Sequence, residues 1–184
     1  MSNPPAQAAV LEATRRWLEE VVIGLNLCPF AGRPWREGRV RLRVSDAVSE
    51  QQLAEHLAEE LMTLQQADPT ERETTLLIHP HVLGDFLDYN DFLDLADAVL
   101  EDLSLDGILQ IASFHPDYRF AEGPADDPAH CTNRSPYPML HLLREASIEC
   151  ATARLPDPEA IYERNIKTMR ELGVAGWRKL IEHD

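Results

Sequence analysis

Hydrophobic and polar positions in the first third of the chain follow first a helical and then an extended spacing. Apolar side chains recur at helical intervals over residues 5–25, and Gly24 and Pro29 mark the end of that helix. Residues 39–44 alternate valine and leucine with three arginines, which is the period-two pattern of a half-buried strand. The run 49–52, Ser-Glu-Gln-Gln, has the spacing of a capping box, and regularly spaced leucines behind it predict a second helix.

The middle of the chain repeats this order of strand and helix. Residues 74–78 form a short β-branched and apolar run, which predicts a second strand. Either Asp88 or Asn90 is expected to cap the next helix, whose apolar period continues to Leu103. Residues 108–114 are nearly continuous in apolar character, as expected of a central strand that is covered on both faces.

The last third is expected to hold two helices and a weaker strand. Ser135 followed by Pro136 is typical of a helix start, and this helix is expected to run to about Ala146. Residues 148–154 are the candidate for a fourth, edge strand. Another cap followed by proline, at 157–158, predicts a long last helix that ends at Gly173.

This order predicts an α/β fold in a single domain over residues 1–184, with three to four mostly parallel strands and helices covering the sheet. Parallel neighbours need crossover connections, and the alternation of strand and helix supplies them. Antiparallel insertion of one strand remains an alternative. At 184 residues the chain is long enough to bury a core without disulfides or a structural metal.

Composition narrows the class of partner and the compartment. The net charge of −15 and the pI near 4.8 argue against nucleic acid, since binding to a phosphate backbone depends on clustered lysine and arginine. No apolar run is long enough for a membrane span, and the first residues lack the layout of a signal peptide. We therefore expect a cytoplasmic location and no membrane partner. Three cysteines without close spacing fit reduced thiols in that compartment.

Polar side chains follow the second and third predicted strands at the point where each strand ends. His79 and His81 follow the second strand, whereas His115 and Asp117 follow the third. If these strands are parallel neighbours, the histidines emerge together at one edge of the sheet, where ligands bind in open parallel sheets. His115 and Asp117 are then the candidate acid and base. The alternative is that these are ordinary strand ends with solvated histidines.

A second candidate feature is the segment that precedes the helix expected at Ser135. A helix start presents free N–H groups and a partial positive charge, and Arg134 adds a guanidinium beside them. This combination suits a phosphate or carboxylate group, with Arg119 and Asn133 as further candidate binding residues. The alternative is a structural cap whose arginine pairs with an acidic side chain.

The cysteines differ in their surroundings. Cys131 lies in a polar loop near His130, where a nearby histidine or a helix start would lower the thiol pKa and make it a nucleophile or a metal ligand. Cys28 has apolar neighbours and is expected to be buried and inert, and Cys150 is expected to lie in the core.

A metal site is the alternative to a purely organic site. The side chains of His79, His81, His115 and Cys131 are of types that bind zinc or another first-row divalent metal. Their spacing matches neither a zinc finger nor the His-Glu-x-x-His helix of metalloproteases. The cofactor therefore stays unknown, with zinc or a similar ion as the candidate.

Three segments carry a family resemblance: Gly-Leu-Asn-Leu-Cys-Pro-Phe at 24–30, Phe-His-Pro-Asp-Tyr-Arg-Phe at 114–120, and the longer run 131–144, which begins Cys-Thr-Asn-Arg-Ser-Pro. In these segments the chain resembles the family known as domain of unknown function 1415, over nearly its whole length. The resemblance implies a cytosolic-type protein of about this size, with no assigned reaction or catalytic residues. It also marks the second and third segments as family landmarks.

The sequence thus leads us to expect a small cytosolic enzyme that acts on an anionic small molecule. Arg134 and Ser135 would hold the anion, His115 and Asp117 would move protons, and Cys131 would serve as nucleophile or metal ligand. The first alternative is a metal-binding or redox-sensing module without turnover. The second is an interaction module of an acidic complex, which only the net charge supports.

Overall fold

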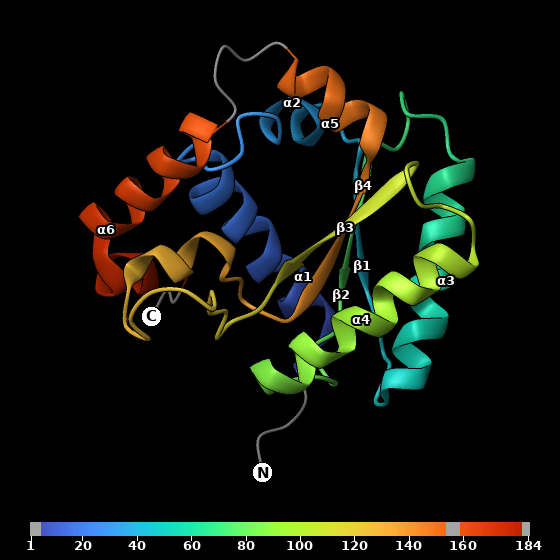
Figure 1. The fold of residues 1–184 in the computed structure, drawn as a ribbon, viewed down its shortest axis with the longest axis horizontal. Coiled ribbons are helices and arrows are strands. Elements are labelled where there is room, and N and C mark those ends of the chain that lie inside the picture. The colour runs from blue at the N-terminus through green and yellow to red at the C-terminus, as the bar shows by residue number, and fades with distance from the viewer. Residues whose placement is uncertain (1–4, 154–158, 182–184) are drawn as a thin grey trace.

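A four-stranded sheet organises the part of the chain that the computed structural model describes, residues 5–153 and 159–181 (Figure 1). The strand order is β1-β2-β4-β3. β1 and β2 are parallel, whereas β4 runs antiparallel to both β2 and β3. The protein is therefore mixed α/β, and the expectation of a mostly parallel sheet is wrong. The strands are β1 (Val40–Val44), β2 (Thr74–Ile78), β3 (Leu109–Phe114) and β4 (Met139–Arg144).

β4 is the strand that the sequence pattern concealed. The segment expected to form a helix from Ser135 instead forms β4, and the expected edge strand at 148–154 lies largely in helix α5 (Glu145–Thr152). The first prediction is wrong because a strand with hydrogen-bonded neighbours on both sides and covered faces carries no alternation of polar residues. The second is wrong because the glutamates and alanines of this segment favour a helix over a strand. The central place of β4 also makes β3 an edge strand and not the expected central one.

Helices cover both faces of the sheet. In Figure 1, α3 and α4 lie on one face, α1 and α6 lie on the other, and α2 and α5 sit together beyond one end of the strands. η1 continues α1 as a π-helix, and η2 is a short 3₁₀ helix packed against α6. No described helix is long and apolar enough to cross a membrane. The bounds are α1 (Gln7–Arg16), η1 (Trp17–Ile23), α2 (Gly32–Arg36), α3 (Glu50–Gln66), α4 (Phe86–Asp102), η2 (Pro128–Asn133) and α6 (Glu159–Ile181).

The helix ends show which of the predicted caps and helix ends are correct. The hydroxyl of Ser49 accepts the N–H of Gln52 at 3.3 Å, so the predicted start of α3 is confirmed. α4 begins earlier than expected, because the carboxylate of Asp85 accepts the N–H groups of Leu87 and Asp88 at 2.8 and 3.3 Å. The prediction of a cap at Asp88 or Asn90 is therefore wrong. The start expected at 157–158 lies outside the described residues, and the last helix does not end at Gly173.

Gly173 is nevertheless a break inside α6. Its φ of 70° and ψ of 164° are not helical, and helical geometry resumes after it up to Ile181. A positive φ of this kind favours glycine, because a Cβ atom would strain the backbone. The glycine signal therefore marked a kink and not an end.

Alternate residues of the strands feed two hydrophobic cores. On the face that α3 and α4 cover, Leu77 and Leu140 pack with leucines of α3 and with Tyr89 of α4. On the other face, Ile78 and Met139 pack with residues of α1, η1 and α6. All four strand residues are fully buried.

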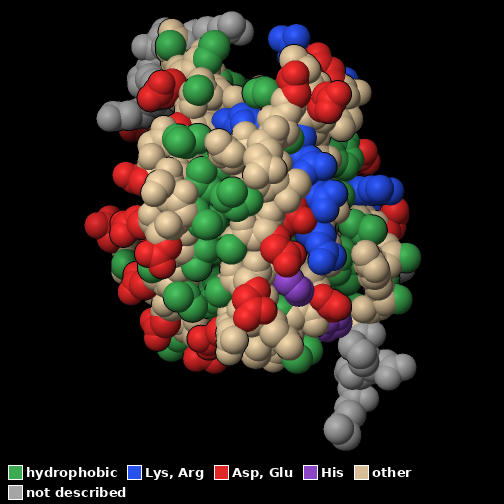
Figure 2. Space-filling view, turned by 90° about the vertical axis from the view of Figure 1, so that its right-hand side faces the viewer, with side chains coloured by type: hydrophobic (Ala, Val, Ile, Leu, Met, Phe, Trp, Pro, Cys, Tyr) green, Lys and Arg blue, Asp and Glu red, His purple; other side chains and the backbone are tan. Residues whose placement is uncertain are grey.

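The arginines that alternate with the apolar residues of the first predicted strand take part in ion pairs. Arg41 of β1 donates to both carboxylate oxygens of Glu60 of α3 at 2.8 and 3.0 Å, and Arg43 lies 3.6 Å from the same carboxylate. Figure 2 shows a band of basic side chains on the face that it views, with acidic side chains around it. A carboxylate that is only 6% exposed requires such partners, because an unpaired buried charge is unfavourable.

Tyr89 connects α4 to the ends of two strands. Its hydroxyl donates to the carbonyl of Met139 at 2.9 Å and accepts the N–H of Phe114 at 3.0 Å. The side chain is fully buried, and this burial raises the pKa of the phenol, so the hydroxyl stays protonated and able to donate. One side chain thus fixes the end of β3 against the start of β4.

We expect Tyr89→Phe to lower the free energy of unfolding by about 1–3 kcal/mol, because both backbone partners lose a buried hydrogen bond. Urea denaturation followed by circular dichroism measures this change. Tyr162→Phe is the matched control, since that side chain on α6 is 57% exposed. Equal stability of the Tyr89 variant and wild type would show that water or a shifted backbone replaces the hydroxyl.

Candidate functional site

The histidines at the ends of β2 and β3 meet around the ring of Tyr89. β4 separates the two strands, so they are not neighbours, but both run antiparallel to β4 and therefore point the same way. The Tyr89 ring centroid lies 5.8 Å from that of His79 and 5.0 Å from that of His115. His81 is exposed, and no contact of its ring with this cluster is found among the described residues. The structure thus brings together His79 and His115, the two fully buried histidines of the expected set.

Backbone hydrogen bonds determine the tautomer of His115. Its Nδ1 accepts the N–H of Asp117 at 3.0 Å, so Nε2 carries the proton and donates to the carbonyl of Leu83 at 3.2 Å. Burial also lowers its pKa, which favours the neutral ring. His115 therefore holds the peptide of Asp117 in place, and both of its nitrogens are already in use.

His79 shares only part of this arrangement. Its Nδ1 donates to the carbonyl of Val82 at 3.1 Å, while its Nε2 is buried without a hydrogen-bond partner among the described residues. Burial, and to a smaller extent the neighbouring His115, lowers its pKa to about 4. The ring is therefore neutral at physiological pH.

A cleft of about 370 Å³ lies between the loop after β3 and the last turns of α6. The loop contributes three of the expected site residues, Asp117, Arg134 and Ser135, and α6 contributes Trp177 and Arg178. Within the described ranges, no carboxylate lies within 4 Å of either guanidinium. The structure thus places two arginines and one carboxylate around one opening.

Contacts to the backbone hold Arg134 at this opening. Its Nε donates to the carbonyl of Tyr118 at 3.3 Å, and its own carbonyl accepts the indole N–H of Trp17 at 3.0 Å. Ser135 does not begin a helix, because its hydroxyl donates to the carbonyl of Tyr137 at 2.7 Å. The positive end of a helix expected beside Arg134 is therefore absent, and the guanidinium of Arg178 supplies positive charge there.

Two other expected binding residues lie away from the cleft lining. Asn133 donates from Nδ2 to the carbonyl of Ser113 at 3.2 Å and so ties the loop to β3. Arg119 is exposed and is not among the residues that line the cleft. Both remain candidates only for a ligand that extends beyond the opening.

Trp177 and Arg178 are the site residues that the sequence did not reveal. They lie more than 40 residues after Arg134 and belong to no recognisable motif. The only local signal was a basic last turn of α6, formed by Arg178 and Lys179. Their approach to the loop depends on the packing of α6 against η2.

The three thiols are placed differently from their predicted surroundings. Cys131 is 1% exposed, and burial raises its pKa although Arg134 and Arg178 act in the opposite direction. Cys28 is half-buried, and its pKa is also raised by burial. Cys150 is exposed, so the expectation that it lies in the core is wrong; it belongs to helix α5, and its place in the predicted strand is wrong as well.

The described residues contain no group of three or more histidine, cysteine, aspartate or glutamate side chains that could hold a metal ion. His79, His81 and His115 therefore form no joint donor set, because His81 is exposed whereas the other two rings are buried.

The mixed sheet and the arginine-lined cleft define a small α/β protein whose candidate site lies in loops and a helix beyond the strand ends. The chain belongs to the family described as protein of unknown function (DUF1415), whose model matches residues 9–179. The resemblance seen in the sequence is thereby confirmed. No curated protein and no solved structure matches the chain.

Acid should destabilise the fold between about pH 6.5 and 4. The unfolded chain protonates the rings of His79 and His141 near pH 6.5, whereas the folded protein does so only near pH 4. Stability is thus complete above pH 6.5 and falls through this window, by on the order of 3 kcal/mol for each ring. Urea titrations at pH 7 and pH 4.5 should show a smaller difference for His79→Gln, and an unchanged one for the exposed His81→Gln. An equal difference in all three proteins would rule out His79 as a source of acid sensitivity.

Alkylation of the native protein should modify Cys150 first and Cys131 last, because thiol reactivity requires both access and thiolate. Iodoacetamide at pH 7.5, followed by peptide mass spectrometry over time, gives this order. Treatment in urea should abolish the difference among the three sites. Fast labelling of Cys131 in the native protein would mean that its thiol is accessible and ionised, which would restore it as the candidate nucleophile.

Proposed function

We propose that this protein is a small enzyme that binds its substrate through a phosphate or carboxylate group in the cleft between Arg134 and Arg178. The observation that carries the proposal is the convergence of these two arginines, from distant segments, on one opening in which no described carboxylate pairs with either. The chain has 32 acidic and 17 basic residues, so a cleft lined by two arginines and one aspartate departs locally from the net negative charge of the chain. A guanidinium is the side chain best suited to binding phosphate and carboxylate.

Asp117 is the residue that we assign to proton transfer. Asp117 lines the same cleft, and the ring of His115 fixes its peptide through a 3.0 Å hydrogen bond. His115 is therefore a positioning residue in this proposal and does not contact the substrate. A general acid or base must lie within hydrogen-bond reach of the proton that it transfers, which the lining position of Asp117 allows.

We assign Cys131 a structural role next to Arg134. Its sulfur lies 3.9 Å from Nη1 of Arg134, and the raised pKa of the thiol favours its neutral form. A neutral, buried thiol is a poor nucleophile. The reaction that we propose therefore depends on the arginines and on Asp117, with no covalent step through Cys131.

Arg178→Gln should weaken binding of inorganic phosphate about tenfold or more, because a charge-assisted hydrogen bond is worth about 1.5–3 kcal/mol. Isothermal titration calorimetry measures the affinity, and the rise of melting temperature with phosphate gives an independent value. Arg178 is exposed and its side chain makes no hydrogen bond to a described residue, so the variant should fold normally.

Lys179→Gln is the matched control. Lys179 is also exposed but does not line the cleft, and its substitution removes the same charge. It should bind phosphate as wild type does. Arg134→Gln is less informative alone, because it also removes a bond to the loop backbone. If wild type binds neither phosphate nor small carboxylates, or if both variants weaken binding equally, the proposal is wrong.

A further inference from the structure

A second and larger cavity, of about 820 Å³, opens on the sheet face opposite α3 and α4. Its floor is formed by alternate residues of all four strands, among them Val40, Leu76, Ala112 and Phe114. Strand β4 lies inside the sheet, and on the face that α3 and α4 cover its residues Leu140 and Leu142 are fully buried. On the cavity face its residues His141 and Leu143 are only half-buried. The cavity is thus a place where an inner strand of the sheet keeps exposed surface.

The walls of this cavity are mainly apolar and rich in aromatic rings. They come from η1, from the loop at 28–31, and from α2 and α5, the two short helices that lie together in Figure 1. The aromatic residues of the lining include Trp17, Phe30, Trp35 and Phe114. Both indole N–H groups already have acceptors within the protein, the carbonyl of Arg134 and a carboxylate oxygen of Glu19, at 3.0 Å each. The tryptophan rings therefore offer a ligand apolar surface and no free donor.

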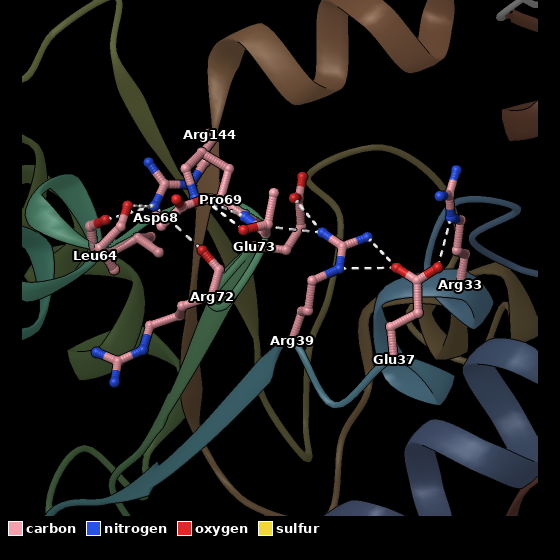
Figure 3. Close-up of polar contacts among 11 residues, drawn as sticks. Arg33, Glu37, Arg39, Leu64, Asp68, Pro69, Arg72, Glu73 and Arg144 are labelled. Carbon is pink, nitrogen blue, oxygen red and sulfur yellow. Dashed lines mark hydrogen bonds and ion pairs between the residues drawn. The ribbon is translucent and has the colours of Figure 1, made fainter.

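The acidic and basic side chains at one side of the lining neutralise one another. The guanidinium groups of Arg33 and Arg39 lie 2.8 and 2.7 Å from the carboxylate of Glu37. Arg39 also lies 2.6 Å from the carboxylate of Glu73, the one acidic residue of the described lining. Figure 3 shows these four residues as one chain of ion pairs. Two positive and two negative charges are thus paired, so this group carries no net charge toward a ligand.

Arg144, the other arginine of the lining, directs its charge to the opposite side of the sheet. Its Nη2 donates to the carbonyls of Leu64, Ala67 and Arg72, at 2.6, 2.8 and 3.1 Å, at the end of α3 (Figure 3). Its Nε is buried. An ion that enters an apolar cavity without a counter-charge loses its hydration and gains no partner. A neutral molecule therefore fits this cavity better than an ion does.

His141 provides the floor with one hydrogen-bond acceptor. The hydroxyl of Thr74 donates to the carbonyl of Leu142, so it accepts the proton on Nε2 of His141 at 2.7 Å. This leaves Nδ1 as an acceptor, and no described residue donates to it. Unlike Nε2 of His79, this nitrogen keeps accessible surface in a half-buried ring. Burial lowers the pKa of the ring to about 4, so Nδ1 is unprotonated at physiological pH.

We propose that this cavity binds an uncharged aromatic molecule that donates a hydroxyl or N–H group to Nδ1 of His141. Cavities of several hundred cubic ångströms with apolar walls and a few placed polar groups are the usual sites of small ligands. Aromatic walls favour an aromatic ligand, because paired rings gain more than their buried area alone provides. The proposal goes beyond the anion cleft and does not rest on it, since the two openings share no lining residue.

Three probes with the same naphthalene ring test this chemistry: 2-naphthol, 2-methoxynaphthalene and 2-naphthylmethylammonium. Calorimetry at pH 7 should show one-to-one binding of 2-naphthol. Its affinity should exceed that of 2-methoxynaphthalene about two- to tenfold, the range of one neutral hydrogen bond, because only the naphthol donates to His141. The ammonium probe should bind more weakly than both, although the net charge of the chain is −15. Absence of naphthol binding, equal affinity for its methyl ether, or tightest binding of the cation would each overturn the proposal.

Four variants place the binding in the cavity and assign the acceptor. Ala146 is an exposed residue of α5 at the lining, so Ala146→Phe narrows the cavity without entering the core and should abolish naphthol binding. Ala98→Phe is the matched control, an exposed alanine of α4 on the opposite side of the sheet. His141→Phe keeps an aromatic floor but should bind naphthol and its methyl ether equally. Arg178→Gln should bind naphthol as wild type does, which separates this site from the anion cleft.

Three outcomes of these variants would contradict the proposal. Undiminished binding in the Ala146 variant would place the ligand elsewhere. A retained preference for naphthol in His141→Phe would mean that another group accepts the ligand's proton. A concentration-dependent dimer that Ala146→Phe dissociates, observed by analytical ultracentrifugation without naphthol binding, would show that a second copy of the chain covers this face.

Discussion

The antiparallel insertion of β4 between β2 and β3 is the constraint on which the rest of this structure depends. Met139, its first residue, lies opposite both Ile78 and Phe114, the last residues of the two neighbouring strands. This register brings the segments after β2 and β3 to one end of the sheet. Arg144, its last residue, reaches the end of α3 at the other end of the sheet. One strand thus runs from the anion cleft at one end of the sheet to the end of α3 at the other.

Three of the described histidines hold loop backbone in place through hydrogen bonds. His115 and His130 each accept one peptide N–H and donate to one carbonyl, and His79 donates to the carbonyl of Val82. A neutral imidazole does this well, because its two nitrogens form one donor and one acceptor. Side chains of a type often used in catalysis therefore hold loops here. One such bond, from the N–H of Asp117 to His115, fixes the backbone of Asp117.

Elements that depend on residues close in sequence were predictable, whereas elements that depend on contacts between distant segments were not. The first three strands and the cap at Ser49 were predictable, because each depends on a pattern within a few residues. β4 was not, since two flanking strands overrule a local signal that resembles a helix start. The start of α4 was missed because Asp85, Asp88 and Asn90 are all suitable caps, and only the packed structure selects one.

The candidate site followed the same rule. Asp117 and Arg134 were found because their loop is rich in polar side chains and proline within a short span. Arg178 was not found, because its place at the cleft depends on how α6 packs against η2. The role of His115 was also beyond the sequence, since only the structure shows that both ring nitrogens bind the backbone.

Trp17 of η1 connects the sheet to the backbone of the anion cleft. Its ring meets Phe114 of β3 edge to face at 5.3 Å, and its indole N–H donates to the carbonyl of Arg134 at 3.0 Å. Trp17 does not line the cleft itself, so it acts on Arg134 through the peptide alone. The position of one cleft arginine therefore depends on how η1 packs against the sheet, and a change in that packing would be transmitted to the anion site.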